Sequence, residues 1–328
     1  MKSRLLSIIS LVIGAAIFIY LLKKTGTAEV VARVRALGVG FVLILTISAV
    51  RQFARAYAWL RCLSDDQRSV GLGAILRARL AGDAMADLTA AGPVIGEPIK
   101  IAQLKGKLSL TAIVSSLAVE NLAYTISVCL MVLAGTLTLL TVFAVGDSIR
   151  NASLLALGLV SMLLLSVLVI LKQRWRVVSS TLAIFLAFFN RAQEKLSRVH
   201  ELEDYVFDFY AKRRVDFLIV ALCELTFHLA GVIEIYVTLH LIGSPGSWVI
   251  AFILEAVNRV INIVFAFVPA MVGVDEAGTG LLTNVLGLGT TTGVTLAIVR
   301  KARMLVWIGL GFLFLSKPQT LLHKHDRL

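Results

Sequence analysis

The feature that most restricts the fold of this chain is a set of long apolar segments with almost no charge. Between Lys107 and Asp147 the only charged residue is Glu120, and this stretch exceeds the roughly 20 residues that an α-helix needs to cross a bilayer. Hydrophobic residues make up 58% of the 328 residues and charged residues 16%, which leaves too little polar surface to cover a soluble globule. The sequence therefore predicts an all-α polytopic membrane protein.

The spacing of the apolar segments predicts about 6–8 membrane helices in two halves. The first segment, Leu5–Leu22, ends before Lys23-Lys24 without a cleavage site of small residues, so we interpret it as a retained helix rather than a signal peptide. We expect a first half at 1–172 and a second half at 215–316, joined by a connector at 173–214 and followed by a polar tail at 317–328.

The distribution of basic residues predicts the orientation. Nine Lys or Arg lie in segment 172–214 and seven in 58–107, whereas 146–150 has one and 242–247 has none. Because basic loops stay in the cytoplasm, the first two segments and both termini are predicted to be cytoplasmic, in a bacterial-type inner membrane. The count does not decide on which side of the membrane the basic loop 23–36 lies. The net charge of +12 fits such loops and anionic lipid headgroups, and no nucleic-acid motif accompanies it.

The connector has apolar side chains near helical spacing among charged ones. This pattern is typical of an amphipathic helix. Such a helix would lie on the inner leaflet or pack beneath the bundle, and the sequence leaves both arrangements open.

Two stretches place Pro, Gly and an acid between apolar helical segments: 93–100, with Glu97 and Lys100, and 269–276, with Asp275 and Glu276. Proline and glycine interrupt helices, and interrupted backbone survives in a membrane only where protein or a water-filled cavity satisfies it. Paired breaks in two halves indicate re-entrant or broken helices of an inverted repeat around a transport site. The alternative is two ordinary surface loops. The predicted break residues are Pro93, Gly96, Pro269 and Gly273.

These motifs resemble a known family. The resemblance rests on Trp59-Leu-Arg-Cys-Leu, Gly92-Pro-Val-Ile-Gly-Glu-Pro-Ile-Lys100, Val268-Pro-Ala-Met-Val-Gly-Val-Asp-Glu276 and the Arg300–Arg303 cluster. Together they are similar to the flippase-like transmembrane region of lysylphosphatidylglycerol synthases, over about residues 5–316. The resemblance implies lipid translocation between leaflets, with re-entrant helices around a central cavity. Members of the multiple-peptide-resistance type add a cytosolic aminoacyl-transfer domain; we expect a stand-alone region here.

Ionisable residues inside the apolar segments are the candidate site. Each costs roughly 2.5–3.5 kcal/mol to insert, so such residues usually face a cavity or pair with each other. Arginine can bind a lipid phosphate through two parallel hydrogen bonds, although the arginines could instead extend to the membrane interface. Glu255 and Arg259, four residues apart, are predicted to neutralise each other. The predicted substrate-binding residues are Arg51, Arg55, Glu97, Lys100, Asp275, Glu276, Arg300 and Arg303.

Glu224 and His228 lie four residues apart in one apolar segment, where they form either a proton relay or a structural hydrogen bond. The chain has no metalloprotease, nucleophile-elbow or phosphate-binding-loop motif and three scattered cysteines, so we expect no catalysis, metal or cofactor. The favoured function is translocation of an anionic or zwitterionic phospholipid. The alternatives are a scaffold for a lipid-synthesis enzyme and an intramembrane transferase.

Overall fold

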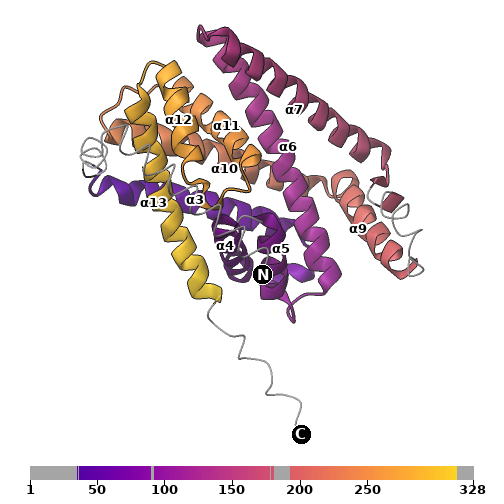
Figure 1. The fold of residues 1–328 in the computed structure, drawn as a ribbon. Coiled ribbons are helices and arrows are strands. Elements are labelled where there is room, and N and C mark those ends of the chain that lie inside the picture. Colours follow the sequence, from indigo (N-terminus) through magenta and orange to yellow (C-terminus); the bar gives the residue numbers. More distant parts are fainter. Residues whose placement is uncertain (1–34, 36, 90–91, 178, 181–192, 316–328) are drawn as a thin grey trace, which may run out of the picture.

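The structure is a computed structural model that describes residues 35, 37–89, 92–177, 179–180 and 193–315. The predicted first span and polar tail lie outside these residues. The described chain consists of helices without strands (Figure 1), which confirms the all-α prediction. The helices are α3 (Gly40–Cys62), η1 (Gln67–Val70), α4 (Leu72–Leu88), α5 (Pro93–Leu104), α6 (Leu110–Val142), α7 (Asp147–Gln173), α9 (Gln193–Lys212), α10 (Arg214–Leu241), α11 (Trp248–Val264), η2 (Pro269–Met271), α12 (Val274–Val285) and α13 (Thr290–Leu315).

Four of the described helices are long and apolar enough to cross a membrane: α3, α6, α7 and α10. Helices α3 and α10 pack along each other in the middle of the bundle. Around this pair, α6 packs on α11 and α13 packs on α4. The protein is thus a multi-pass membrane protein whose central helix pair is flanked by two further helix pairs.

Both flanking pairs are held close by a small residue on each helix. A Cβ at Gly135 of α6 would lie 2.1 Å from Cβ of Ala256 in α11, and a Cβ at Gly311 of α13 would lie 2.6 Å from Cβ of Ala84 in α4. Small residues let membrane helices approach until their backbones touch. Glycine is therefore required at both crossings.

Helix α7 lies at the outside of the bundle. It packs on α6, and Ser153 is its one buried residue. Between Leu154 and Val169, most of its exposed side chains are leucine, methionine or valine, as expected for a helix whose surroundings are lipid.

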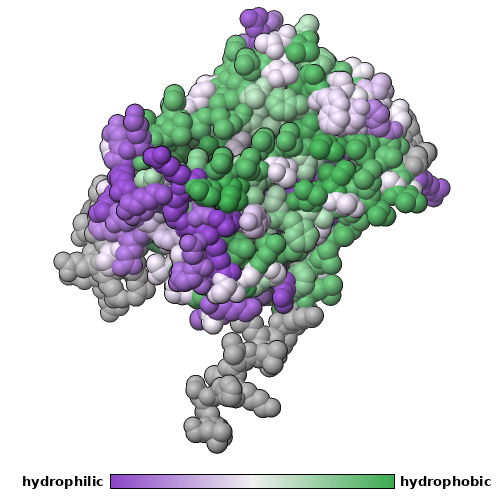
Figure 2. Space-filling view, turned by 180° about the vertical axis from the view of Figure 1, so that it is seen from behind, coloured by the Kyte–Doolittle hydropathy of each residue, from purple (hydrophilic) through white to green (hydrophobic). Residues whose placement is uncertain are grey.

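Helix α9, from the connector, packs against α6 and α10 and buries Phe207 and Phe209. Tyr205 donates a hydrogen bond to the Cys62 carbonyl at the end of α3, 2.6 Å away. On the face shown in Figure 2, hydrophilic residues gather on the side where α9 lies, and hydrophobic residues cover most of the rest. On the exposed side of α9, hydrogen bonds from Lys212 and Arg174 hold the pKa of Asp208 below its ordinary value. Part of the connector, 181–192, lies outside the described residues.

The first interruption lies before the predicted one. Helix α4 ends at Leu88 and α5 begins at Pro93, so the chain turns between them, with Gly92 at φ +38°. Proline is favoured at the first position of a helix because its missing N–H has no partner to lose there. Stretch 93–100 is therefore helical, and Gly96 lies inside α5. A Cβ on Gly96 would lie 2.8 Å from the carbonyl oxygen of Gly82, so this glycine allows α4 and α5 to touch.

The second interruption, at 265–273, starts before the predicted stretch 269–276 and overlaps it. Helix α11 ends at Val264, η2 follows at Pro269, and α12 begins after Gly273 at φ +84°. Ala270 and Met271 also have positive φ values, +52° and +50°. This conformation costs about 1–3 kcal/mol for a residue with a side chain, so the surrounding contacts must hold it in place.

Candidate functional site: a cation-lined cavity between the helix breaks

A cavity of about 640 Å³ lies between the two helix breaks. Its volume is within the range of small-molecule binding sites. Residues of α3, α4, α5, α6, α10, α11, α12, α13 and both breaks line it. Its charged lining comprises eight basic residues, Arg51, Arg55, Arg79, Lys100, Arg259, Arg300, Lys301 and Arg303, and four acidic ones, Asp83, Asp87, Glu97 and Asp275.

Arg51 joins three helices at one wall of the cavity. Its Nη1 lies 3.1 Å from Oε2 of Glu234 in α10, and its Nη2 lies 3.1 Å from Oε1 of Glu255 in α11. Glu255 also accepts a hydrogen bond from Arg259, so the predicted pairing within α11 is present but is shared with α3. Glu234 also pairs with Arg303 of α13.

Arg55, one turn further along α3, pairs with Glu120 of α6. Nε and Nη2 of Arg55 lie 2.8 and 2.6 Å from Oε1 of Glu120, which also accepts from Arg79 Nη1 of α4 at 3.2 Å. The Arg55 guanidinium lies 3.7 Å from the ring centroid of Tyr124, an attractive cation–π contact. Arg51 and Arg55 are both buried in the bundle rather than extended to its surface.

In α5, the helix that follows the first break, Lys100 lies between two acids. Its Nζ is 3.0 Å from Oδ1 of Asp83 in α4 and 2.9 Å from Oε1 of Glu97 in α5. Glu97 pairs with Lys100 within α5 instead of capping the start of the helix. The first turn of α5 contains no acid, and Gly92 provides no side chain to cap it.

The second break has its own acidic cap. Oε2 of Glu276 accepts a hydrogen bond from the Gly273 N–H at 2.8 Å, and Glu276 also pairs with Lys301 of α13. Lys301 Nζ donates to the Met271 carbonyl at 3.1 Å. This cap and this donor hold the left-handed residues of the break against α13.

Arg300 connects α13 to the start of α12. Its Nη2 lies 2.6 Å from Oδ1 of Asp275 and also donates to the Thr279 hydroxyl. Within the described part of the chain, its Nε and Nη1 have no hydrogen-bond partner, although the residue is buried. A buried guanidinium with unused donors is able to bind a further acceptor.

The cavity lining is more positive than the region around it. Five buried carboxylates that pair with cavity cations do not themselves line the cavity. Basic side chains therefore face the cavity while their counter-ions lie behind them, an arrangement that favours an anionic ligand. These five residues are Glu120, Glu224, Glu234, Glu255 and Glu276.

Glu224 and His228 lie behind this wall, on α10. They do not contact each other directly: the Ser127 hydroxyl of α6 lies 3.1 Å from Nε2 of His228 and 3.3 Å from Oε2 of Glu224. The side chain of Glu224 also approaches Arg55, with 3.8 Å between Oε1 and Nε.

Seven of the eight predicted substrate-binding residues line the cavity, and Glu276 lies behind it. Sequence reasoning left Arg79, Glu234 and Lys301 out of the site. The isolation of Glu120 in its apolar segment was a signal for a buried partner. No comparable signal marked Arg79, which lies near other charged residues, Arg77 and Asp83, in a segment rich in alanine and leucine.

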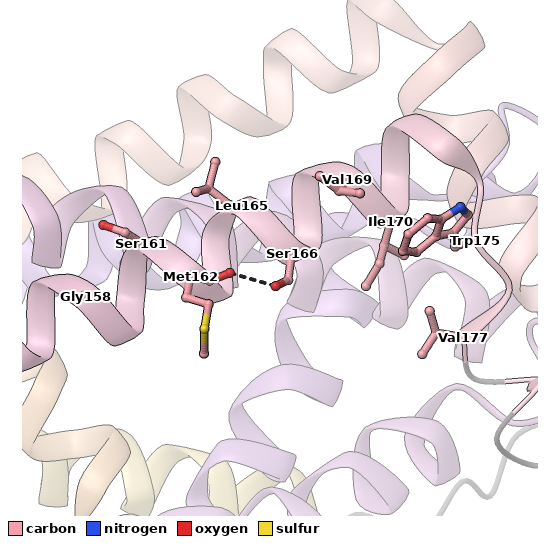
Figure 3. A pocket seen from close by; sticks show the side chains of 9 residues that line it. All are labelled: Gly158, Ser161, Met162, Leu165, Ser166, Val169, Ile170, Trp175 and Val177. Carbon is pink, nitrogen blue, oxygen red and sulfur yellow. Dashed lines mark hydrogen bonds between the residues drawn. The ribbon is translucent and has the colours of Figure 1, made fainter.

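A second hollow, an apolar groove of about 660 Å³, runs along α7 (Figure 3). Its lining runs from Gly158 to Val177 and contains no charged side chain. The hydroxyl of Ser166 donates to the Met162 carbonyl within the helix at 2.7 Å. Its polar lining is limited to two serines and one tryptophan, so the groove lacks the set of converging polar contacts that orients a ligand.

No group of three or more His, Cys, Asp or Glu side chains among the described residues is arranged to hold a metal ion. A family model described as "Lysylphosphatidylglycerol synthase TM region" matches residues 7–311. The chain belongs to this family. No curated protein and no solved structure matches the chain. The match includes both helix breaks and every residue that lines the cavity, and the family is one related to membrane phospholipids.

Proposed function

We propose that the protein is a lipid translocator, which moves a phospholipid between the two leaflets of a bacterial-type inner membrane. The observation that carries the proposal is the cation-lined cavity of about 640 Å³ between two helix breaks. A phospholipid headgroup must cross roughly 30 Å of hydrocarbon, where an unpaired charge is costly. A cavity with basic side chains facing inward replaces part of the water that the headgroup loses.

The proposal includes an inverted repeat with one re-entrant pair in each half. Support comes from helix contacts that run between the two halves in a reciprocal way. Helix α6 of the first half packs on α11 of the second half, and α13 of the second half packs on α4 of the first half. The glycine crossings at Gly135 and Gly311 match in the same way. Two such halves provide a central site from which each leaflet is reached by rocking one half against the other.

Within this function, Arg300 binds the lipid phosphate, whereas Arg51 and Arg55 of α3 hold the helices of the cavity wall together. Arg51 and Arg55 each hold two carboxylates, so their charge is largely neutralised. Arg300 pairs with one carboxylate and keeps two donors unused. The acids around Lys100 would attract an amino group, so both anionic and zwitterionic headgroups fit. The proposed activity has no covalent step, and both termini are cytoplasmic.

Translocation is measured with the purified full chain in vesicles that contain a fluorescent phosphatidylglycerol or phosphatidylcholine. Dithionite added outside destroys only outer-leaflet fluorophores, so lipid that reaches the outer leaflet continues to be lost. We expect faster loss with the protein than in empty vesicles, and slower loss with Arg300→Ala. Arg77→Ala is the matched control, because Arg77 is exposed on α4 and lies outside the cavity. Loss at the rate of empty vesicles with the folded protein would contradict the proposal.

A further inference from the structure

Three polar side chains behind the cavity wall form a cluster that the headgroup site does not use. Glu224, Ser127 and His228 join α10 to α6, and both Glu224 and His228 are at least nine-tenths buried, at 2% and 6% exposure. Oε1 of Glu224 and Nδ1 of His228 have no hydrogen-bond partner among the described residues. Each side of the Ser127 hydroxyl therefore carries one buried polar atom without a hydrogen-bond partner, a carboxylate oxygen on one side and a ring nitrogen on the other.

Glu224 is more weakly paired than its neighbour Glu120. Glu120 accepts three hydrogen bonds of 2.6 to 3.2 Å from Arg55 and Arg79. Glu224 has one 3.3 Å hydrogen bond from Ser127 and one 3.8 Å approach to Arg55. Burial penalises a charge that few groups stabilise. Protonation of Glu224 therefore costs fewer contacts than protonation of Glu120 would.

Charged groups from every neighbouring helix face this cluster. The charges near Glu224 have opposite effects on its carboxylate, because two guanidinium groups attract its negative charge and one carboxylate repels it. The charges near His228 are mainly positive, and they disfavour a positive charge on its ring. The groups are Arg51, Arg55, Arg79, Glu120, Glu255 and Arg259, together with the uncharged Tyr210 and Cys62 from α9 and α3.

On α10, Glu224 lies between Val220, which belongs to an apolar cluster, and Phe227, which lines the cavity. One turn before Glu224 on α10, Val220 is fully buried in an apolar cluster with Phe209 of α9 and Val119 of α6. On the other side, Tyr124 and Phe227 line the cavity next to Glu224, Ser127 and His228.

We propose that Glu224 is a proton-binding site that couples headgroup binding in the cavity to proton uptake. A proton from water adds to the Glu224 carboxylate and forms one O–H bond, while His228 orients the Ser127 hydroxyl. Arg55 then keeps Glu120 as its counter-ion but loses the second negative charge. The cavity wall gains one positive charge, so one anionic headgroup enters together with one proton. This inference rests on the headgroup site of the proposed function.

Calorimetric titration of the full chain in detergent with short-chain phosphatidylglycerol tests this coupling. Repeating the titration in two buffers of different ionisation enthalpy gives the number of protons taken up. We expect about one proton per phosphatidylglycerol and an affinity that rises by up to about tenfold for each unit of falling pH. With Glu224→Gln, which resembles the protonated state, we expect tight binding, no uptake and no dependence on pH. Phosphatidylcholine, which has no net charge, should bind without proton uptake.

The control is Glu201→Gln, which removes an exposed carboxylate of α9 and should leave proton uptake unchanged. If Glu224→Gln does not fold, Ser127→Ala serves as the second variant and should weaken the pH dependence. Wild-type binding without proton uptake, or uptake that persists in Glu224→Gln, overturns this inference. Proton-linked binding in detergent without translocation in vesicles overturns the proposed function alone. Translocation without proton uptake overturns the coupling alone.

Discussion

Nη2 of Arg55 lies 2.6 Å from Oε1 of Glu120, within the membrane bundle and at the wall of the cavity. The two residues are 65 positions apart in the chain, and each is buried. Arg79 of α4 shares the same carboxylate oxygen. This single oxygen therefore connects α3, α4 and α6, so the group that sets the charge of the wall also holds its helices together.

We predict that Arg55→Ala destabilises the folded protein by about 3–5 kcal/mol, because it leaves Glu120 with half of its buried pairing. The expected result is a clear fall in the unfolding midpoint of the detergent-solubilised chain, measured by circular dichroism. The double variant Arg55→Met with Glu120→Leu removes both charges, but it also takes Glu120 from Arg79 and Arg55 from Glu224, so it should recover only part of that loss. An unfolding midpoint equal to wild type in Arg55→Ala would show that the pair contributes nothing to stability.

We predict that Arg300→Lys slows lipid translocation while the protein stays folded. Lysine keeps the positive charge and can still pair with Asp275, but it loses the planar group that makes several directed hydrogen bonds. The rate in vesicles should fall between those of wild type and Arg300→Ala. Equal rates for Arg300→Lys and wild type would mean that charge alone is sufficient at this position.

Much of this architecture could be predicted from the sequence. The length of the apolar segments determines the membrane helices, and the paired Pro-Gly-acid motifs locate both interruptions to within a few residues. The motif at Pro93 is displaced because proline starts a helix as readily as it ends one. The sequence cannot separate these two roles without knowing where α4 ends.

The partners of the charged residues could not be predicted. Spacing identifies pairs within one helix, such as Glu255 and Arg259, but Arg55 and Glu120 meet only because α3 and α6 cross at that depth. Glu234 shows the same limit, since its two cations come from α3 and α13. Pairing across helices depends on how each helix is rotated about its axis and on how deep it lies in the membrane. The sequence pattern of one helix determines neither.

We predict that Gly311→Val separates α13 from α4 and destabilises the fold. A Cβ at this position would lie 2.3 Å from the Leu80 carbonyl oxygen, which is backbone and cannot move aside on its own. Gly309→Val is the matched control, since a Cβ at Gly309 has no atom within 4 Å. We expect a lower unfolding midpoint for Gly311→Val than for Gly309→Val, and equal midpoints would contradict the observed crossing.

The last prediction concerns access to the cavity from water. In a chain whose three cysteines are replaced by alanine, a single cysteine at Ala270 should react with a membrane-impermeant thiol reagent, because this residue lines the charged cavity. A single cysteine at Leu163, which is exposed on α7, should not react, since that surface faces lipid. Short-chain phosphatidylglycerol should slow the reaction at position 270 by occupying the cavity. Reaction at both positions at the same rate, unaffected by the lipid, would place the second break on an ordinary surface loop.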